Sequence, residues 1–217
     1  ANDYMRPIIG QPVSSLNFRK IMDEGKLLLV NLSKGKIGDI NAGLLGMVVV
    51  GKILLAALSR ADMPEGQRKD FNLYIDEFQN FTTDSIATIL SEARKYRLNL
   101  VVAHQFIAQL ADKIRDAVFG NVGSQVVFRV GADDAKFLVK QFAPVFSEAD
   151  LVNIDNLNAV VKLLINGQTS RSFNMKLILR SPRFIEGLAG TLKEQSRQTY
   201  GGNREEVEAD ILKRLRG

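Results

Sequence analysis

The stretch Leu73–Phe81, LYIDEFQNF, places two adjacent carboxylates, Asp76 and Glu77, directly after a short apolar run of strand length. Another polar side chain, Gln105, follows the apolar run NLVVAH at residues 99–104. In open parallel sheets, ligands sit beyond the carboxyl ends of the strands. We therefore expect these three side chains to lie close together at one edge of a sheet.

These residue types suit phosphoryl transfer to water. An Asp at a strand end can hold Mg²⁺, usually through water, because this ion keeps most of its hydration shell. Glu77 can orient or deprotonate an attacking water, and Gln105 can hydrogen-bond that water or a terminal phosphate, since an amide both donates and accepts. The alternative is that Asp76 and Glu77 form a solvated loop that caps the following helix.

Apolar runs of strand length alternate with helical patterns along most of the chain. The predicted strands cover residues 26–32, 71–76, 99–104 and 125–130, and the predicted helices cover residues 43–59 and 84–96. Asp84 is a candidate N-cap of the second helix, whose apolar face carries Ile86, Ile89, Leu90 and Ala93. Strands without polar alternation, separated by helices, indicate an α/β fold with a parallel sheet covered on both faces.

The pattern divides the chain into three parts: an irregular leading segment at residues 1–25, an α/β core at residues 26–181, and a linker with a terminal helix at residues 182–217. Within the core, the run from Asn158 predicts an antiparallel hairpin closed by Asn166-Gly167, which extends the sheet at one edge.

The last segment contains a predicted linker, QSRQTYGGN at residues 195–203, and then a helix. Val207, Ile211 and Leu215 form a narrow apolar stripe, and Asp210 precedes Arg214 by four residues. We expect this helix to dock on its own domain or on a neighbour; a solvated tail is the alternative.

Arg94 lies on the helix between the two strands that end in polar residues, at the border of its apolar face. From there a guanidinium could reach from one subunit toward the phosphates of a neighbour, as an arginine finger does. The alternative is a surface arginine that pairs with Glu92 or with a carbonyl at the helix C-terminus.

Composition limits the kinds of site that are possible. The 217 residues include no cysteine and one histidine, which excludes disulfides and the usual zinc constellations, so any metal is a hard cation held by oxygens. The net charge of +5 is compatible with a polyanionic partner without proving one. No secretory signal is visible, which fits a cytoplasmic protein or a piece cut from one. The apolar run at residues 43–58 carries Lys52 and indicates a buried helix rather than a membrane span.

No sequence feature provides a convincing phosphate loop. Residues 46–53, GMVVVGKI, satisfy G-x-x-x-x-G-K but place Ile53 where Ser or Thr should bind magnesium, and the apolar residues between belong to a helix. Residues 32–39, LSKGKIGD, follow a predicted strand but lack the spacing. Lys34 and Lys36 there could lie near phosphates or DNA, or be solvated loop lysines.

In combination, MDEGKLLLVNLSKGKIG, LYIDEFQNF, LSEARKYRLNLVVAHQ and GNVGSQVVFRVGADDA closely resemble the C-terminal part of the motor domain of conjugative, type IV secretion coupling-protein ATPases of the TraG/TraD type. These belong to the HerA/FtsK group of P-loop ring ATPases. The resemblance covers roughly residues 5–180. It implies a RecA-like fold, a hexameric ring and ATP-driven movement of DNA through its channel.

The resemblance also assigns roles to individual residues. It makes Asp76 the Walker B aspartate, which holds the magnesium of Mg-ATP, and Glu77 the catalytic glutamate. It makes Gln105 the sensor glutamine and Arg94 the trans-acting finger, with Lys95 and Arg97 as nearby alternatives. His104, alone at a strand end, is expected to serve packing or hydrogen bonding.

In that family the phosphate loop lies upstream of the first motif quoted above. We therefore expect this chain to be an incomplete domain, inactive alone, whose parent binds DNA and relaxase or secretion-channel proteins at the inner face of the membrane. One alternative is a non-catalytic module that binds DNA or protein. Another is a magnesium-dependent nuclease that uses Asp76, Glu77 and Asp84.

Overall fold

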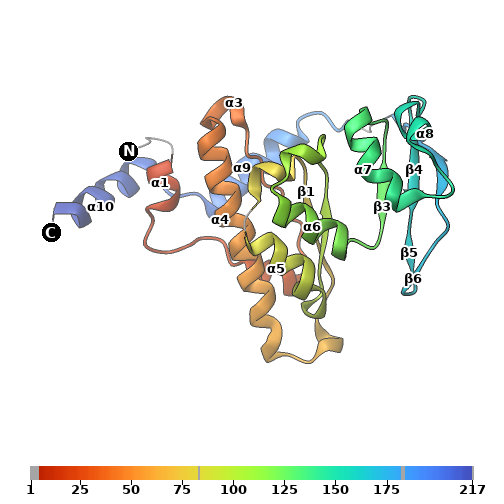
Figure 1. Ribbon diagram of the computed structural model, residues 1–217. Coiled ribbons are helices and arrows are strands. Elements are labelled where there is room, and N and C mark those ends of the chain that lie inside the picture. The colour runs from red at the N-terminus through yellow and green to blue at the C-terminus, as the bar shows by residue number, and fades with distance from the viewer. Residues whose placement is uncertain (1–4, 83, 182–183, 217) are drawn as a thin grey trace. The chain divides into compact units, whose positions relative to one another are not determined.

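The computed structural model describes residues 5–82, 84–181 and 184–216 (Figure 1). The chain divides into two compact units. Unit 1 comprises residues up to Phe71, Lys95–Asn99 and the chain after Ser181, and unit 2 comprises Asn72–Arg94 and Leu100–Ser181.

The two strands that precede the polar residues form a pair, β1 (Phe71–Ile75) and β2 (Leu98–Val102). The amide of Phe71 donates to the carbonyl of Arg97 at 2.8 Å, and the amide of Ala103 donates to the carbonyl of Ile75 at 3.0 Å. Because both partners advance together along the chain, the pair is parallel. This part of the predicted parallel sheet is confirmed.

The connection between β1 and β2 is helical. It contains η3 (Phe78–Phe81), α5 (Asp84–Glu92) and η4 (Ala93–Tyr96). Ile86, Ile89 and Ala93 are buried, as the helical spacing predicts. The predicted N-cap role of Asp84 concerns a side chain outside the described part of the structure.

Unit 2 has its own core, where helices pack against a small antiparallel sheet. The elements are α6 (Asp112–Asn121), β3 (Gln125–Val127), α7 (Ala132–Phe142), α8 (Glu148–Val152), β4 (Asn158–Lys162) and β7 (Phe173–Lys176). Leu138, Phe142, Leu151 and Val160 are buried together in this core. The strand order is β3-β4-β7, with Val127 opposite Val160 and Val161 opposite Phe173.

The predicted hairpin is confirmed, but the predicted single parallel sheet is only partly correct. A two-residue turn, Asn166-Gly167, joins β5 (Leu164–Ile165) to β6 (Gln168–Thr169), and both turn residues have positive φ, 50° and 79°. However, β3 ends at Val127 rather than at residue 130 and pairs antiparallel with β4. Among the described residues it has no parallel partner.

Unit 1 is built from helices. They are α1 (Met5–Ile9), α2 (Phe18–Glu24), α3 (Lys34–Ile37), α4 (Asp39–Leu58), η1 (Ser59–Asp62), η2 (Glu65–Gln67), α9 (Leu188–Tyr200) and α10 (Arg204–Arg216). The leading segment is therefore partly helical rather than irregular. Asn17 caps α2 by accepting from the amide of Lys20, and Gly25 ends it in the left-handed conformation.

Two predictions for unit 1 are wrong. Residues 26–32 form no strand, since they pair with no strand of the described structure, and Leu27 and Leu29 remain 85% and 77% exposed. Residues 195–200 of the predicted linker belong to α9, so only residues 201–203 separate the last two helices.

The apolar helix α4 begins at Asp39, four residues earlier than predicted, and buries Ala42, Val50, Ile53 and Leu54. Residues 39–62 are long and apolar enough to cross a membrane by length and composition alone, and a third of the most apolar window is buried. The prediction of a buried helix is therefore confirmed only in part, because Ile40 and Leu55 are exposed.

The docking of the last helix is confirmed within unit 1, where α10 packs against α1 (Figure 1). Ile211 is buried, and Arg214 donates to the carbonyl of Gly10 while pairing with Asp210 at 3.0 Å. Only part of the predicted stripe is covered, because Leu215 is 76% exposed.

Candidate functional site

The turn after β1 holds Asp76 and Glu77 in a defined conformation. Glu77 lies in the left-handed region at φ 50°, and its amide donates to Oδ1 of Asp76 at 3.0 Å. Its carbonyl accepts from the backbone amide and from Nδ2 of Asn80, both at 3.0 Å. The buried rings of Phe78 and Phe81 anchor the following turn. The carboxylates thus stand on a turn fixed by both hydrogen bonds and packing.

Glu77 and Gln105 meet as the sequence predicts. Nε2 of Gln105 donates to Oε1 of Glu77, and Nε2 of Gln79 donates to Oε2 of the same carboxylate at 2.5 Å. The backbone supports this pairing, because the amide of Phe78 donates to the carbonyl of Ala103 at 3.0 Å. Both carboxylate oxygens are therefore oriented by amide donors.

Asp76 is exposed beside this pair. Among the described residues no group of three or more His, Asp or Glu side chains could enclose a metal. A single exposed carboxylate fits an ion that keeps most of its water, as Mg²⁺ does, and does not fit an ion that needs a full set of protein ligands.

Arg94 lies in η4, and its side chain is exposed. Within the described residues it makes no hydrogen bond or ion pair, so the alternative pairing with Glu92 is not observed. Its two basic neighbours do have partners: Nζ of Lys95 lies 5.2 Å from the ring centroid of Tyr96, and Arg97 lies 3.8 Å from Asp70. Arg94 is the member of this basic trio that remains available to a second molecule.

His104 packs against the anchor of the carboxylate turn. Its ring meets that of Phe78 edge-on, with centroids 5.4 Å apart. Burial lowers the pKa of His104 from its ordinary value, and the carboxylates of Asp134 and Glu77 oppose this shift in part. A neutral, packed imidazole agrees with the expectation that His104 serves packing.

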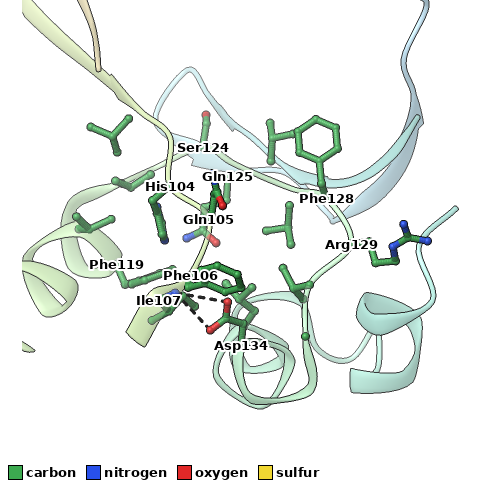
Figure 2. Close-up of a pocket in the computed structure, with 18 residues that line it drawn as sticks. His104, Gln105, Phe106, Ile107, Phe119, Ser124, Gln125, Phe128, Arg129 and Asp134 are labelled. Atoms are coloured by element: carbon green, nitrogen blue, oxygen red, sulfur yellow. Dashed lines mark hydrogen bonds between the residues drawn. The ribbon is translucent and has the colours of Figure 1, made fainter. Parts of the chain in front are cut away.

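A pocket of about 500 Å³ lies beside Gln105, between the end of β2 and the edge of β3 (Figure 2). It is mainly apolar, with Val102 from β2, Val126 and Val127 from β3, and Val118 from α6. The figure also shows Asp134, whose carboxylate accepts from the amide of Ile107 at 3.3 and 3.4 Å.

Sequence reasoning missed this pocket. The run SQVVFRVG at residues 124–131 lines it, but its apolar residues gave no signal beyond a strand. Asp134 also belongs to no local motif that would indicate a site. It lies on α7 and reaches the pocket only in the folded chain.

Neither of the two stretches that the sequence offers as a phosphate loop forms one in the described structure. Residues 46–53 lie inside α4, where the backbone amides are committed to the helix, as the sequence indicates. Lys34 and Lys36 belong to the short helix α3, and Lys34 lies 3.6 Å from Asp39.

The match to known proteins falls on this region. Residues 70–157 match the family model described as the TraM recognition site of TraD and TraG. These residues span β1 to the end of α8 and include Asp76, Glu77, Arg94 and Gln105. The resemblance of this region to TraG/TraD coupling proteins is thus confirmed. A comparison with curated proteins found no match.

Solved structures show the same fold. The plasmid coupling protein TrwB, in complex with the GTP analogue GDPNP, matches 85% of this chain and 49% of its own at 20% identity, with a TM-score of 0.60. TrwB with ADP and Mg²⁺ matches 76% of this chain and 44% of its own at 20% identity, with a TM-score of 0.59.

A third match is the genome packaging NTPase B204 of Sulfolobus turreted icosahedral virus 2 with AMPPCP, at 12% identity and a TM-score of 0.52. It covers 77% of this chain and 74% of its own. The chain spans less than half the length of the TrwB chains that it matches. At these identities the likeness establishes a shared α/β fold for part of the matched chains.

Proposed function

We propose that this chain supplies the Walker B, sensor and finger portion of an ATP-hydrolysing site in a DNA-translocating coupling protein. The observation that carries this proposal is the hydrogen bond from Gln105 to Glu77 at the ends of two parallel strands, inside the matched region. Carboxylate and amide at this edge are the groups that bind and activate a water beside a terminal phosphate.

In this account each side chain has a defined role. Glu77 orients the attacking water and takes its proton; its two oxygens keep lone pairs for that water although each accepts an amide proton. Gln105 positions Glu77 and hydrogen-bonds the terminal phosphate. Asp76 would hold Mg²⁺ through water, and this ion would supply charge neutralisation at the phosphates.

Arg94 acts on a second copy of the chain. Its exposed side chain, without a partner among the described residues, reaches toward the nucleotide of a neighbouring subunit. A guanidinium there stabilises the negative charge that develops on the transferred phosphoryl group. This role requires a ring of subunits, which we propose as a hexamer around DNA.

The phosphate cradle comes from a segment outside the described residues. The pocket beside Gln105 separates two strand edges, one on β2 and one on β3, that have no described partner. A further strand seated there would bind both edges, and a loop at its end would lie beside Gln105 and Glu77. The site then consists of two parts that only together bind Mg-ATP.

The parent protein would act at the cytoplasmic face of a membrane, with DNA, relaxase or secretion-channel proteins as partners. A partner of the TraM kind is a further candidate, from the description of the matched family. A second function, a binding module without hydrolysis, is favoured by one observation: residues 46–53 are helical and offer no phosphate loop.

Calorimetric titration with a non-hydrolysable ATP analogue and Mg²⁺ tests this account. We expect no detectable binding to this chain alone and micromolar binding to the full-length protein that carries it. Binding to neither would favour the module without hydrolysis. Micromolar binding to this chain alone would contradict the proposal of a divided site.

A further inference from the structure

Arg60 is a fully buried charged residue, with 0% of its side chain exposed. Its Nε donates to Oδ1 of Asp23 at 3.0 Å, and its Nη1 donates to the backbone carbonyls of Lys69 at 2.9 Å and Tyr96 at 3.1 Å. Nη2 is buried without a partner in the part of the chain that the structure describes. Burying a charge and an unpaired donor is costly, so this arrangement is a poor choice for stability alone.

The two carbonyls that Arg60 joins have equivalent positions. Lys69 lies two residues before β1, and Tyr96 lies two residues before β2. One nitrogen atom therefore holds the starts of both parallel strands. The first hydrogen bond of the pair follows directly, from the amide of Phe71 to the carbonyl of Arg97 at 2.8 Å.

The register set at this end determines the residues that meet at the other. The backbone hydrogen bonds place Phe71 opposite Leu98 and Ile75 opposite Val102. A slip of one residue would turn the side chain of Gln105 to the other face of the pair. A slip of two would move it by about 6.6 Å, beyond hydrogen-bonding distance of Glu77.

We propose that Arg60 is a positioning residue that sets the register of β1 against β2 and, through it, the pairing of Glu77 with Gln105. Only a guanidinium can serve Asp23 with one nitrogen and two carbonyls with another in fixed directions. The catalytic meaning of this pairing rests on the proposed function, whereas the register itself does not.

The absence of native cysteine makes the register measurable by disulfide trapping. Tyr74 and Val101 are opposite each other in the observed register and are 72% and 46% exposed. Neighbouring strands are about 4.8 Å apart, within the range that a disulfide spans. The pair Tyr74→Cys with Val101→Cys reports the native register, and the pair Asn72→Cys with Val101→Cys reports a slip of two residues.

The ratio of the two cross-linking rates under mild oxidation is the quantity to compare. We expect Arg60→Gln to lower the native-to-slipped ratio about tenfold, as loss of a charged hydrogen bond implies. General loosening would accelerate or slow both pairs together, so the ratio separates positioning from stability. Arg19→Gln is the matched control, because Arg19 binds the same Asp23 but no strand carbonyl, and its ratio should be unchanged.

If Arg60→Gln does not fold, as judged by circular dichroism, Arg60→Lys is measured in its place. Lysine keeps a charge near Asp23 but has a single nitrogen, so we expect the ratio to fall here too. An unchanged ratio in either folded variant would overturn the proposal. Because trapping requires no nucleotide, the result stands apart from the proposed function, which the calorimetric titration tests separately.

Discussion

Gln105 donates a hydrogen bond from Nε2 to Oε1 of Glu77, a residue 28 positions earlier in the chain. The contact exists because β1 and β2 are parallel and end at the same edge. Gln79, in the turn that follows, donates a hydrogen bond to the other carboxylate oxygen of Glu77. The candidate base is thus oriented by a distant and a local amide, a preorganised arrangement that suits positioning of a water.

Arg94 should matter only in the assembled protein. We expect Arg94→Ala in the full-length protein to reduce ATP hydrolysis by about 10³-fold, because a trans-acting arginine neutralises transition-state charge. Lys95→Ala is the control; its ammonium has a partner at Tyr96 and should change the rate little. Mixing Arg94→Ala with Glu77→Gln subunits should restore partial activity, because each complements the other across the interface. Failure of the mixture with both variants assembled would argue against a role in trans.

Gly10 permits the contact between α1 and α10. A Cβ at this position would lie 2.7 Å from Cδ1 of Ile211 and 2.6 Å from the carbonyl oxygen of Arg6. We expect Gly10→Ala to weaken the docking of α10 by about 1–3 kcal/mol, as overpacking does, and to increase hydrogen exchange in residues 204–216. Gly190→Ala in α9 is the control, since its Cβ would meet nothing within 4 Å. Equal exchange in both variants would contradict the close contact.

The lowered pKa of His104 predicts how the stability of the fold depends on pH. Burial lowers its pKa below the ordinary value of 6.5, so the unfolded chain binds a proton more readily than the folded chain. The free energy of unfolding should therefore fall as the pH drops through about 6.5 toward the lower, folded pKa. His104→Gln should remove this part of the pH dependence in urea titrations. As the sole histidine, His104 also gives one imidazole NMR signal, and a pKa at or above 6.5 would contradict the shift.

Local signals in the sequence were sufficient for some features. Asn166-Gly167 predicts a two-residue hairpin turn because both residues tolerate positive φ, and this turn is observed. Asp76, Glu77 and Gln105 could be placed at one edge because each follows an apolar run, and a parallel pair brings such ends together.

Other features depend on contacts that no local pattern reveals. Residues 26–32 have the composition of a strand, but a strand forms only where it pairs with another, and these residues pair with none in the described structure. β3 reads as a parallel strand from its apolar residues, yet the hairpin supplies an antiparallel partner in β4. No sequence pattern around Arg60 indicates its role, because the two carbonyls that it binds lie 9 and 36 residues away.

Substitution of Glu77 in the full-length protein tests the central claim most directly. Glu77→Gln keeps the size of the side chain but removes the base, so we expect steady-state ATP hydrolysis to fall by at least about 10²-fold. Calorimetric binding of a non-hydrolysable ATP analogue with Mg²⁺ should remain within a few-fold of the parent protein, since Asp76 and the phosphate cradle are intact. Hydrolysis at the parent rate, with nucleotide binding retained, would contradict the assignment of Glu77 as the catalytic base.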